Sequence, residues 1–236
     1  MREAIEQVLA TARTGGLRFG QVAVQPNDRG GFIITHRDDQ GEAGLQAFTK
    51  PEDALAIARF DESGEYRPLK TAPNLRRGWR LELQTLTDLQ WALDNFYPGR
   101  LAIFAAWRSG QLPTTSLRET LGRQTGIYRI AARISDQQIE KLTADFCKSD
   151  GGCLRTILWK RDPGGAKPSE NLPPKKFDPA QDQAGDERTE GRALIPLLCQ
   201  EACNLLVAEC RKAVKSKDGG ASSCEPGDDA ASRENK

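Results

Sequence analysis

Four of the six cysteines in this 236-residue chain form two pairs on either side of a long polar segment. Cys147 and Cys153 precede the segment, and Cys199 and Cys203 follow it. Four convergent thiolates in an intracellular protein are the ligand set of an iron-sulfur cluster or of a structural zinc ion. The two pairs can share such a ligand only if the fold brings them to one place.

The rest of the sequence favours metal binding over disulfides. The first residues, MREAIEQVLATA, lack the apolar stretch and cleavage pattern of a secretory signal, which predicts a cytoplasmic protein. A reducing compartment disfavours disulfides, and the chain is long enough to bury an ordinary core without them. No run approaches the roughly 20 apolar residues that a membrane-spanning helix needs. We therefore expect no membrane partner.

The charge balance argues against a nucleic-acid partner. With 34 Lys and Arg against 33 Asp and Glu, the chain lacks the positive field that non-specific nucleic-acid binding usually shows. The local cluster of Arg76, Arg77, Trp79 and Arg80 is more typical of a solvated strand edge with one packed tryptophan. The sequence contains no phosphate loop, dinucleotide fingerprint or arrangement of serine, histidine and carboxylate for catalysis.

An α+β fold is predicted, and its first half mixes strand and helix signals. Residues 21–24 and 31–35 flank a turn-rich segment and predict a β-hairpin, and residues 79–83 alternate as a half-buried strand. Thr49 is a candidate cap for a helix that ends at Phe60, with Leu55 and Ala58 facing the core. Residues 101–107 suit either a buried strand or a short helix.

Helix-start signals recur from residue 87 onward. Thr87 with Gln90, Ser116 with Glu119, and Ser135 with Gln138 are each spaced as capping boxes. The first predicted helix carries Leu89, Leu93 and Phe96 on one face. The third runs from residue 136 to about Cys147, which places that cysteine at a helix end. Glycines 151 and 152 allow a tight turn before Cys153, which a strand or short helix follows.

The composition then changes at residues 161–192, which are rich in Pro, Gly, Lys and acidic residues and predict a disordered insertion. Doubling the length of a loop adds only about 0.6 kcal/mol of closure cost, so this insertion does not prevent the cysteine pairs from converging. The segment from Pro196 to Cys210 is predicted to be helical, with Cys199 and Cys203 on one face near its positive end. After Ser216 a disordered tail is predicted.

Spacing alone leaves three interpretations of the cysteines. The CxxxC pair fits structural zinc sites, whereas the gap between Cys147 and Cys153 does not, and neither pair matches the CxxC runs of bacterial ferredoxins. Cysteine is also among the most buried residue types, so simple packing without metal is the third interpretation. Iron-sulfur cluster, zinc and no metal all remain open at this point.

Three segments carry a resemblance to a known family. They are RQTGIYR at 123–129, CLRTILW at 153–159 and PLLCQEACNLLVAECR at 196–211, with Tyr97-Pro98-Gly99 upstream. Together these segments resemble the C-terminal region of CbiX-type bacterial sirohydrochlorin chelatases. In that family a stabilising domain is followed by a 4Fe-4S cluster-binding domain. The resemblance implies a stabilising-type domain at 1–115, a cluster domain at 116–215 and a tail at 216–236. It also implies a 4Fe-4S cluster held by Cys147, Cys153, Cys199 and Cys203.

One departure from the family bears on activity. The metal-inserting domain of these chelatases is not present in this sequence, and His36 is the single histidine, predicted to be an ordinary strand-face residue. The chain alone is therefore not expected to be a chelatase. A redox or accessory role in tetrapyrrole metabolism follows, with a separately encoded sirohydrochlorin chelatase or a redox protein as partner. A zinc-stabilised or metal-free interaction module is the alternative.

The remaining cysteines and some neighbours receive other roles. Cys210 is predicted to pack in the core, and Cys224 to be an exposed thiol in the tail. Residues that could surround a cluster and tune it through hydrogen bonds and solvent exclusion are Arg123, Tyr128, Arg155 and Trp159. Ordinary core and surface roles remain open for each of these four.

Overall fold

The computed structural model describes residues 2–67, 74–147, 153, 155–165 and 193–220. In chain order its elements are α1 (Arg2–Ala10), η1 (Thr11–Arg13), β1 (Leu17–Phe19), β2 (Val22–Pro26), β3 (Phe32–His36), η2 (Arg37–Asp39), β4 (Gln46–Phe48), α2 (Asp53–Ala58), β5 (Trp79–Leu83), α3 (Leu86–Phe96), α4 (Arg100–Arg108), α5 (Leu117–Gly122), η3 (Gly126–Arg133), α6 (Asp136–Phe146), β6 (Arg155–Ile157), β7 (Ala193–Ile195), β8 (Leu197–Cys199) and α7 (Asn204–Gly220). The fold is α+β, as the sequence predicts.

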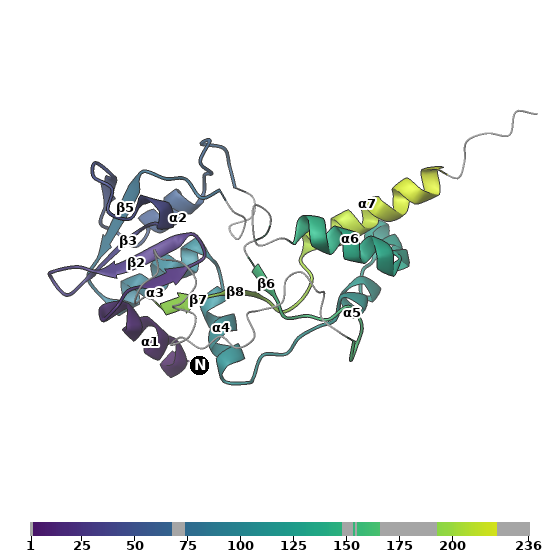
Figure 1. Ribbon diagram of the computed structural model, residues 1–236, viewed down its shortest axis with the longest axis horizontal. Coiled ribbons are helices and arrows are strands. Elements are labelled where there is room, and N and C mark those ends of the chain that lie inside the picture. The colour runs from purple at the N-terminus through teal and green to yellow at the C-terminus, as the bar shows by residue number, and fades with distance from the viewer. Residues whose placement is uncertain (1, 68–73, 148–152, 154, 166–192, 221–236) are drawn as a thin grey trace, which may run out of the picture.

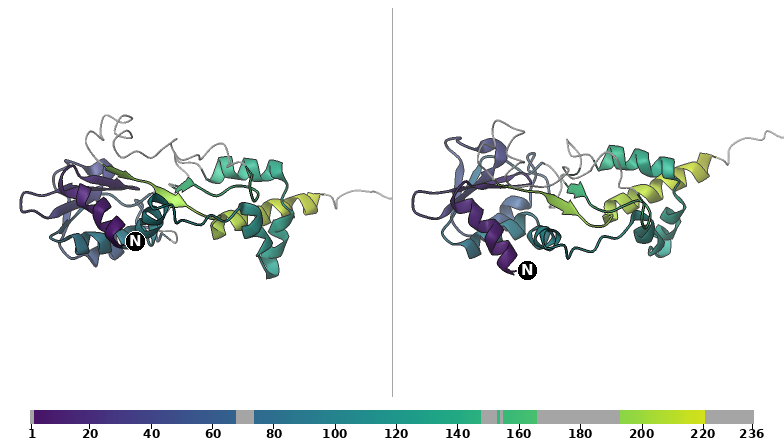
Figure 2. Two further views of the ribbon diagram at one scale, coloured as in Figure 1. Left: turned by 90° about the horizontal axis from the view of Figure 1, so that it is seen from below. Right: turned by 60° about the horizontal axis from the view of Figure 1, so that its bottom comes forward.

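The molecule is elongated, with two lobes along its long axis (Figures 1 and 2). The N-terminal lobe comprises α1 to α4 and a mixed sheet of six strands in the order β4-β5-β3-β2-β1-β7. The C-terminal lobe comprises α5, η3, α6 and α7. The short parallel pair of β6 and β8 lies between them. None of the described helices combines the length and apolar character that a bilayer crossing requires.

Strand alternation builds the core of the N-terminal lobe. Every second residue of β3 and β5 is buried, including Phe32, Ile34, Trp79 and Leu81, and these side chains share one cluster with the buried faces of α1 to α4. Positions between them are more polar, as in the ion pair of Arg80 with Glu82. The period of two places one face of the sheet against helices and gives the other a polar character.

The predicted hairpin is confirmed as β2 and β3, which pair in antiparallel register from Val22 with His36 to Pro26 with Phe32. Asn27 closes its turn, since Asn27 Oδ1 accepts hydrogen bonds from the backbone N–H groups of Arg29 and Gly31. An asparagine side chain that bonds the backbone a few residues ahead is a common turn device.

Several helix predictions need correction in detail. The helix after Pro51 begins at Asp53 with Glu52 at its N-cap, so Thr49 does not cap it, and Leu55 is 47% exposed instead of buried. Ala58 does face the core. The cap of α3 is Thr85, whose side chain accepts from the N–H of Asp88, two residues before the predicted position. The face of α3 that carries Leu89, Leu93 and Phe96 is buried as predicted.

Residues 101–107, which the sequence left open between strand and helix, lie in helix α4. The residues after Cys153 form strand β6. Arg77 pairs with Asp38 and Arg80 with Glu82 at the surface, and Trp79 is packed, as expected, but β5 is not an edge strand because it lies between β4 and β3. His36 ends β3, is 1% exposed, and its Nδ1 accepts from the N–H of Asp38.

Two predicted disordered segments lie largely outside the described residues. Of the insertion at 161–192, residues 161–165 are described and form a turn, and 166–192 are outside. Of the tail, 221–236 are outside, but α7 continues to Gly220, so the prediction that order ends at Ser216 is wrong for 216–220. Helix α7 carries no glycine or proline before residue 219, and nothing in that stretch ends it sooner.

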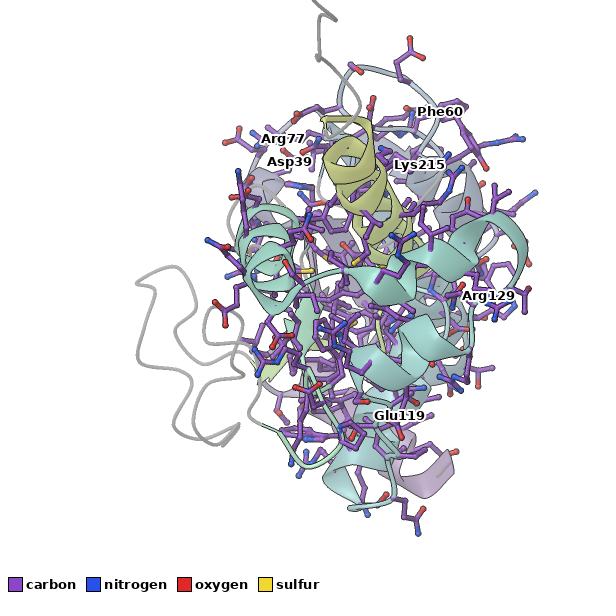
Figure 3. All side chains as sticks on the ribbon, turned by 90° about the vertical axis from the view of Figure 1, so that its right-hand side faces the viewer. Asp39, Phe60, Arg77, Glu119, Arg129 and Lys215 are labelled. Atoms are coloured by element: carbon purple, nitrogen blue, oxygen red, sulfur yellow. The ribbon has the colours of Figure 1, made fainter. Side chains whose placement is uncertain are left out.

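The C-terminal lobe is organised around its own apolar cluster. Its members come from α5, η3, α6, α7 and the strand pair, and include Leu117, Ile139, Trp159, Leu206 and Cys210. Seen from its C-terminal end, the lobe presents charged residues such as Glu119, Arg129 and Lys215 on its surface (Figure 3). The capping boxes predicted at Ser116 and Ser135 are both present and start α5 and α6. Each satisfies two backbone N–H groups that a helix start leaves without partners.

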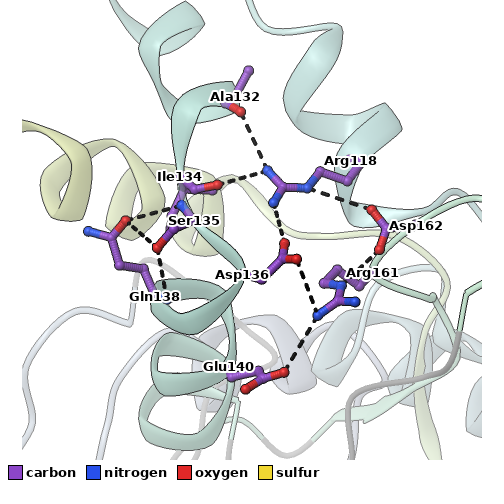
Figure 4. A network of polar contacts seen from close by, with 9 residues as sticks. All are labelled: Arg118, Ala132, Ile134, Ser135, Asp136, Gln138, Glu140, Arg161 and Asp162. Carbon is purple, nitrogen blue, oxygen red and sulfur yellow. Dashed lines mark hydrogen bonds and ion pairs between the residues drawn. The ribbon is translucent and has the colours of Figure 1, made fainter.

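A polar network fixes α5 and α6 to the segment after β6 (Figure 4). Arg118 donates to the carbonyl of Ile134 at 2.9 Å and pairs with Asp136 and Asp162, while Arg161 pairs with Asp136, Asp162 and Glu140. Single exposed ion pairs contribute about 0–1 kcal/mol, so the value of this arrangement lies in its connected geometry. It holds the start of α6 beside the strand that follows Cys153.

Candidate metal centre

The four predicted ligand cysteines line one pocket. Cys147, Cys153, Cys199 and Cys203 share it with Phe146, Arg155, Ile157, Trp159 and Leu206. The thiols come from four different places in the chain: the end of α6, the residue before the β6 segment, the end of β8 and the residue before α7. The fold therefore brings together two pairs that are separated by more than forty residues of sequence.

The first pair is placed by a helix end and a strand start. Cys147 is the C-cap of α6, where its N–H donates to the carbonyl of Thr143 at 3.0 Å. Cys153 lies just ahead of β6. Strand β6 pairs in parallel with β8, with Ile157 opposite Cys199, so the pairing carries both pairs of cysteines to the same end of the lobe. The expectation that Cys147 ends a helix is confirmed.

The second pair is positioned differently from the prediction. Residues 196–203 are not helical: Pro196 separates β7 from β8, Cys199 ends β8, and the helix begins only at Asn204. The Cys199 thiol donates to the carbonyl of Glu201 at 3.0 Å in the intervening turn. The sheet pairing of 197–199 with β6 and the lack of an N–H on Pro196 favour strand over helix here.

The predicted effect of the helix macrodipole applies to Cys203 alone of this pair. The carbonyl of Cys203 accepts from the N–H of Val207 at 3.1 Å, so Cys203 stands at the N-terminal end of α7. A negative charge near such an end gains roughly 0.3–1 kcal/mol. The same benefit does not extend to Cys199, because Cys199 lies on a strand and not in the first turn of the helix.

Burial disfavours the thiolate form at three of the four cysteines. Burial raises the pKa of Cys147 well above its usual range, and the other cysteines of the pocket act in the same direction. Burial also raises the pKa of Cys153 and of Cys199, against the opposing effect of the Arg155 charge on both. A bound cationic centre would offset this cost, because a metal ligates the deprotonated form.

Two of the four residues predicted to surround a cluster lie at the cysteine pocket. Arg155 and Trp159 line the pocket. Arg123, by contrast, is exposed and pairs with Glu201, while Tyr128 lies beneath the guanidinium of Arg211, 5.3 Å from the ring centroid. Neither belongs to the lining of this pocket within the described residues. Tyr128 lies on η3, which packs against α7, and Arg123 is the C-cap of α5. Their positions in the sequence do not indicate which way these side chains point.

Trp159 is the polar group of the pocket that lacks a partner. Its side chain is 1% exposed, and its indole Nε1 is buried with no hydrogen bond inside the described structure. The indole N–H lies near enough to Cys199 to lower the pKa of that thiol, although its alignment falls short of a hydrogen bond. A buried donor beside a thiol suits an anionic sulfur, because an unmet buried N–H costs about 1–3 kcal/mol.

Sequence reasoning missed Arg100, the first residue of α4 in the N-terminal lobe. Its Nη1 donates to the carbonyl of Leu198 at 2.9 Å, next to Cys199. This hydrogen bond ties the guanidinium to the backbone beside Cys199, although Arg100 itself is not among the residues that line the pocket. No local pattern marks this residue, since it lies nearly a hundred positions before the strand that it contacts.

The four thiols are a suitable donor set for a metal centre, although their sulfur atoms are not arranged in the geometry of a bound metal. Among the described residues no group of three or more His, Cys, Asp or Glu side chains is arranged to hold a metal. What supports the fit is the donor chemistry: four thiols in one mostly apolar pocket, with a buried indole N–H and cationic side chains beside them. The residues that would hold a cluster are the four cysteines, and the surrounding groups would tune it.

The other two cysteines lie apart from this set. Cys210 is fully buried in the core of the C-terminal lobe, as predicted, and burial raises the pKa of its thiol to about 11. It does not line the pocket within the described structure. Cys224 lies outside the described residues.

Comparison with known proteins agrees with the chemistry of this pocket. Residues 109–212 match the 4Fe-4S iron-sulfur cluster binding domain. This match to the cluster-binding domain includes all four cysteines of the pocket. Residues 1–109 match the DR2241 stabilising domain. The two matches together follow the order that the sequence resemblance implied, although neither one identifies the CbiX type.

A solved structure shares the fold of most of the chain. DR2241 from Deinococcus radiodurans matches with a TM-score of 0.70 and 30% sequence identity over 91% of this chain. That protein is described as a multi-domain protein with structural similarity to chelatases and with two additional novel domains. The present chain spans 42% of its length. No curated protein matches the sequence.

Proposed function

We propose that this chain binds a 4Fe-4S cluster through Cys147, Cys153, Cys199 and Cys203. The observation that carries the proposal is the convergence of these four thiols in one pocket, within the segment that matches a cluster-binding domain. When bound, a cluster supplies one-electron chemistry whose potential depends on net charge, hydrogen bonds to sulfur and solvent exposure. The chain's own residues provide the thiolates, exclude water through Phe146, Ile157 and Leu206, and present cations and an indole N–H.

Anaerobic purification tests this proposal directly. The expected product is brown, with iron and acid-labile sulfide in the proportions of a 4Fe-4S cluster and the matching visible and electron paramagnetic resonance spectra. A colourless protein with one tightly bound zinc per chain would refute the cluster and support the structural zinc site, for which thiolate ligands are equally suited.

Single Cys→Ser variants test the ligand set. We expect cluster loss when serine replaces any of the four pocket cysteines, because each supplies one ligand. Cys210→Ser and Cys224→Ser are the matched controls and should retain iron and sulfide, since Cys210 does not line the pocket and the sequence predicts Cys224 to lie in the tail. Full cluster content in Cys147→Ser would show that the ligand set is different.

The wider role proposed is a redox or accessory one, in the cytoplasm, linked to tetrapyrrole metabolism. Its support is the similarity of DR2241 to chelatases and the similarity of this chain to part of DR2241. The chain is not proposed to be a chelatase by itself, because its single histidine is buried at the end of β3 and cannot reach a large substrate. A separately encoded sirohydrochlorin chelatase is the proposed partner.

The partner proposal is tested by mixing the purified, cluster-loaded chain with such a chelatase. We expect a complex on size-exclusion chromatography and a changed rate of metal insertion into sirohydrochlorin. The Cys199→Ser variant, without cluster, separates an effect of the cluster from an effect of the protein surface. Absence of both the complex and the rate change would remove the tetrapyrrole link while leaving cluster binding intact.

A further inference from the structure

A cation from the N-terminal lobe reaches the cysteine pocket of the C-terminal lobe. Arg100 is the first residue of α4, which packs beside β8. Its Nη1 donates a hydrogen bond to the carbonyl of Leu198 at 2.9 Å. Its Nε is buried and makes no hydrogen bond within the described structure. A guanidinium has five donors in a fixed fork, so this side chain retains buried capacity for an anionic acceptor.

The surroundings of Arg100 favour a negatively charged neighbour. Burial lowers the pKa of Arg100, and the positive charge of Arg155 lowers it further. An anion beside the buried guanidinium would therefore stabilise its charged form.

A bound cluster would supply the missing negative charge. Four thiolates outweigh the positive core of a cluster, so the loaded site is anionic, and it gains one more negative charge when a one-electron donor reduces it. A nearby cation stabilises the more negative, reduced form more than the oxidised form. Arg155 provides such a charge from within the cluster-binding segment, whereas Arg100 provides it from the segment that matches the stabilising domain.

We propose that Arg100 is a positioning residue through which the N-terminal lobe raises the reduction potential of the cluster. The inference rests on the proposed cluster binding and adds a role for the first 109 residues beyond stability. Arg100 holds the end of β8 by its hydrogen bond to the Leu198 carbonyl, which places its charge next to the residue that precedes Cys199. The two lobes are thus parts of one redox site.

The test is an anaerobic potentiometric titration of the whole chain with dithionite, followed by electron paramagnetic resonance. Arg100→Gln should lower the midpoint potential, with about a tenfold change in the reduction equilibrium, equivalent to about 59 mV for a one-electron couple. Arg108→Gln is the matched control, since it removes the same charge from the exposed far end of the same helix. That variant should keep the wild-type potential.

Two further variants separate charge from shape and cover a failure of Arg100→Gln to fold. Arg100→Lys keeps the charge and should stay close to the wild-type potential. In Arg100→His the introduced imidazole is charged only at low pH, so the potential should fall relative to wild type as pH rises through about 6.5. A potential that is equal to wild type in Arg100→Gln, or a flat difference in Arg100→His, overturns the proposal.

The same samples keep the two proposals distinct. Wild-type protein that contains no iron and sulfide defeats the proposed function, and the role of Arg100 falls with it. Wild-type protein that contains the cluster but shows no dependence on the charge at position 100 defeats this inference alone. Cluster content is measured in every variant before titration, so a lost cluster is not mistaken for a shifted potential.

Discussion

The substitution Trp159→Phe should affect the stability of the iron-free protein and the affinity for the cluster differently. The indole of Trp159 is 1% exposed, and its N–H has no partner in the described structure. Phenylalanine keeps an aromatic ring and removes the N–H. In the iron-free protein the smaller ring loses packing, but an unmet donor worth about 1–3 kcal/mol also disappears, so the two effects oppose each other.

In the loaded protein the substitution removes a hydrogen bond instead. An N–H that donates to an anionic sulfur contributes about 1.5–3 kcal/mol. The packing loss is common to both forms and cancels in the comparison. Cluster affinity should therefore fall by at least about 1.5–3 kcal/mol, or at least about 10- to 150-fold, because the relief of the unmet donor in the iron-free form adds to the lost hydrogen bond. The free energy of unfolding of the iron-free protein should change much less.

The assay compares two equilibria. Cluster affinity is followed by competition with an iron chelator under anaerobic conditions, and the stability of the iron-free protein by urea unfolding with circular dichroism. Trp79→Phe is the matched control, because Trp79 is equally buried but donates to the carbonyl of Arg76 at 2.6 Å in the N-terminal lobe. It should destabilise both forms alike. Equal losses in both forms for Trp159→Phe would refute the role assigned to its N–H.

Three further predictions concern stability. Burial raises the pKa of Tyr97 to about 12 from 10.0, and its hydroxyl accepts from the N–H of Gln21 at 2.7 Å. Since the folded-state pKa is the higher one, stability present below pH 10 should fall by about 2–3 kcal/mol as pH rises toward 12. Urea unfolding of Tyr97→Phe should lack this component, and an unchanged alkaline profile would contradict the assignment. Ser135→Ala removes the α6 cap and should cost about 1 kcal/mol of unfolding free energy, whereas Ala substitution of exposed Ser109 should cost less. Cys210→Ala should lower the melting temperature through a small cavity yet leave iron content unchanged, and loss of iron would make Cys210 part of the site.

Local signals in the sequence predicted most of the elements that flank the site. The capping boxes at Ser116 and Ser135 are visible at a spacing of three residues, and each starts the helix that it predicts. The hairpin of β2 and β3 is equally local, because both strands and a turn rich in Gly, Asn and Asp lie within sixteen residues. Signals of this kind depend on neighbours in sequence, and the fold did not override them.

The strand assignment at residues 193–199 could not be obtained in this way. Its apolar run lies four residues before α7 and has the composition of a buried helix. Strand pairing decides the outcome: β7 pairs in parallel with β1, from Leu17 opposite Ala193, and β8 with β6. Both partners are distant in sequence, and a parallel pair leaves no turn between its strands to signal the pairing. The helical placement of Cys199 failed for this reason, as did recognition of Arg100.

Strands β7 and β8 connect the two lobes physically. β7 forms an edge of the N-terminal sheet beside β1, and after Pro196 the same strand direction continues as β8 into the cysteine pocket. Ile195, Leu197 and Leu198 pack in the N-terminal core, whereas Cys199, the next residue, packs with the C-terminal cluster. The apolar anchor thus ends one residue before a proposed ligand, where Arg100 also binds the backbone. Because an anchored strand holds its last residue in a fixed place, the N-terminal lobe would determine the position of one proposed cluster ligand as well as the charge beside it.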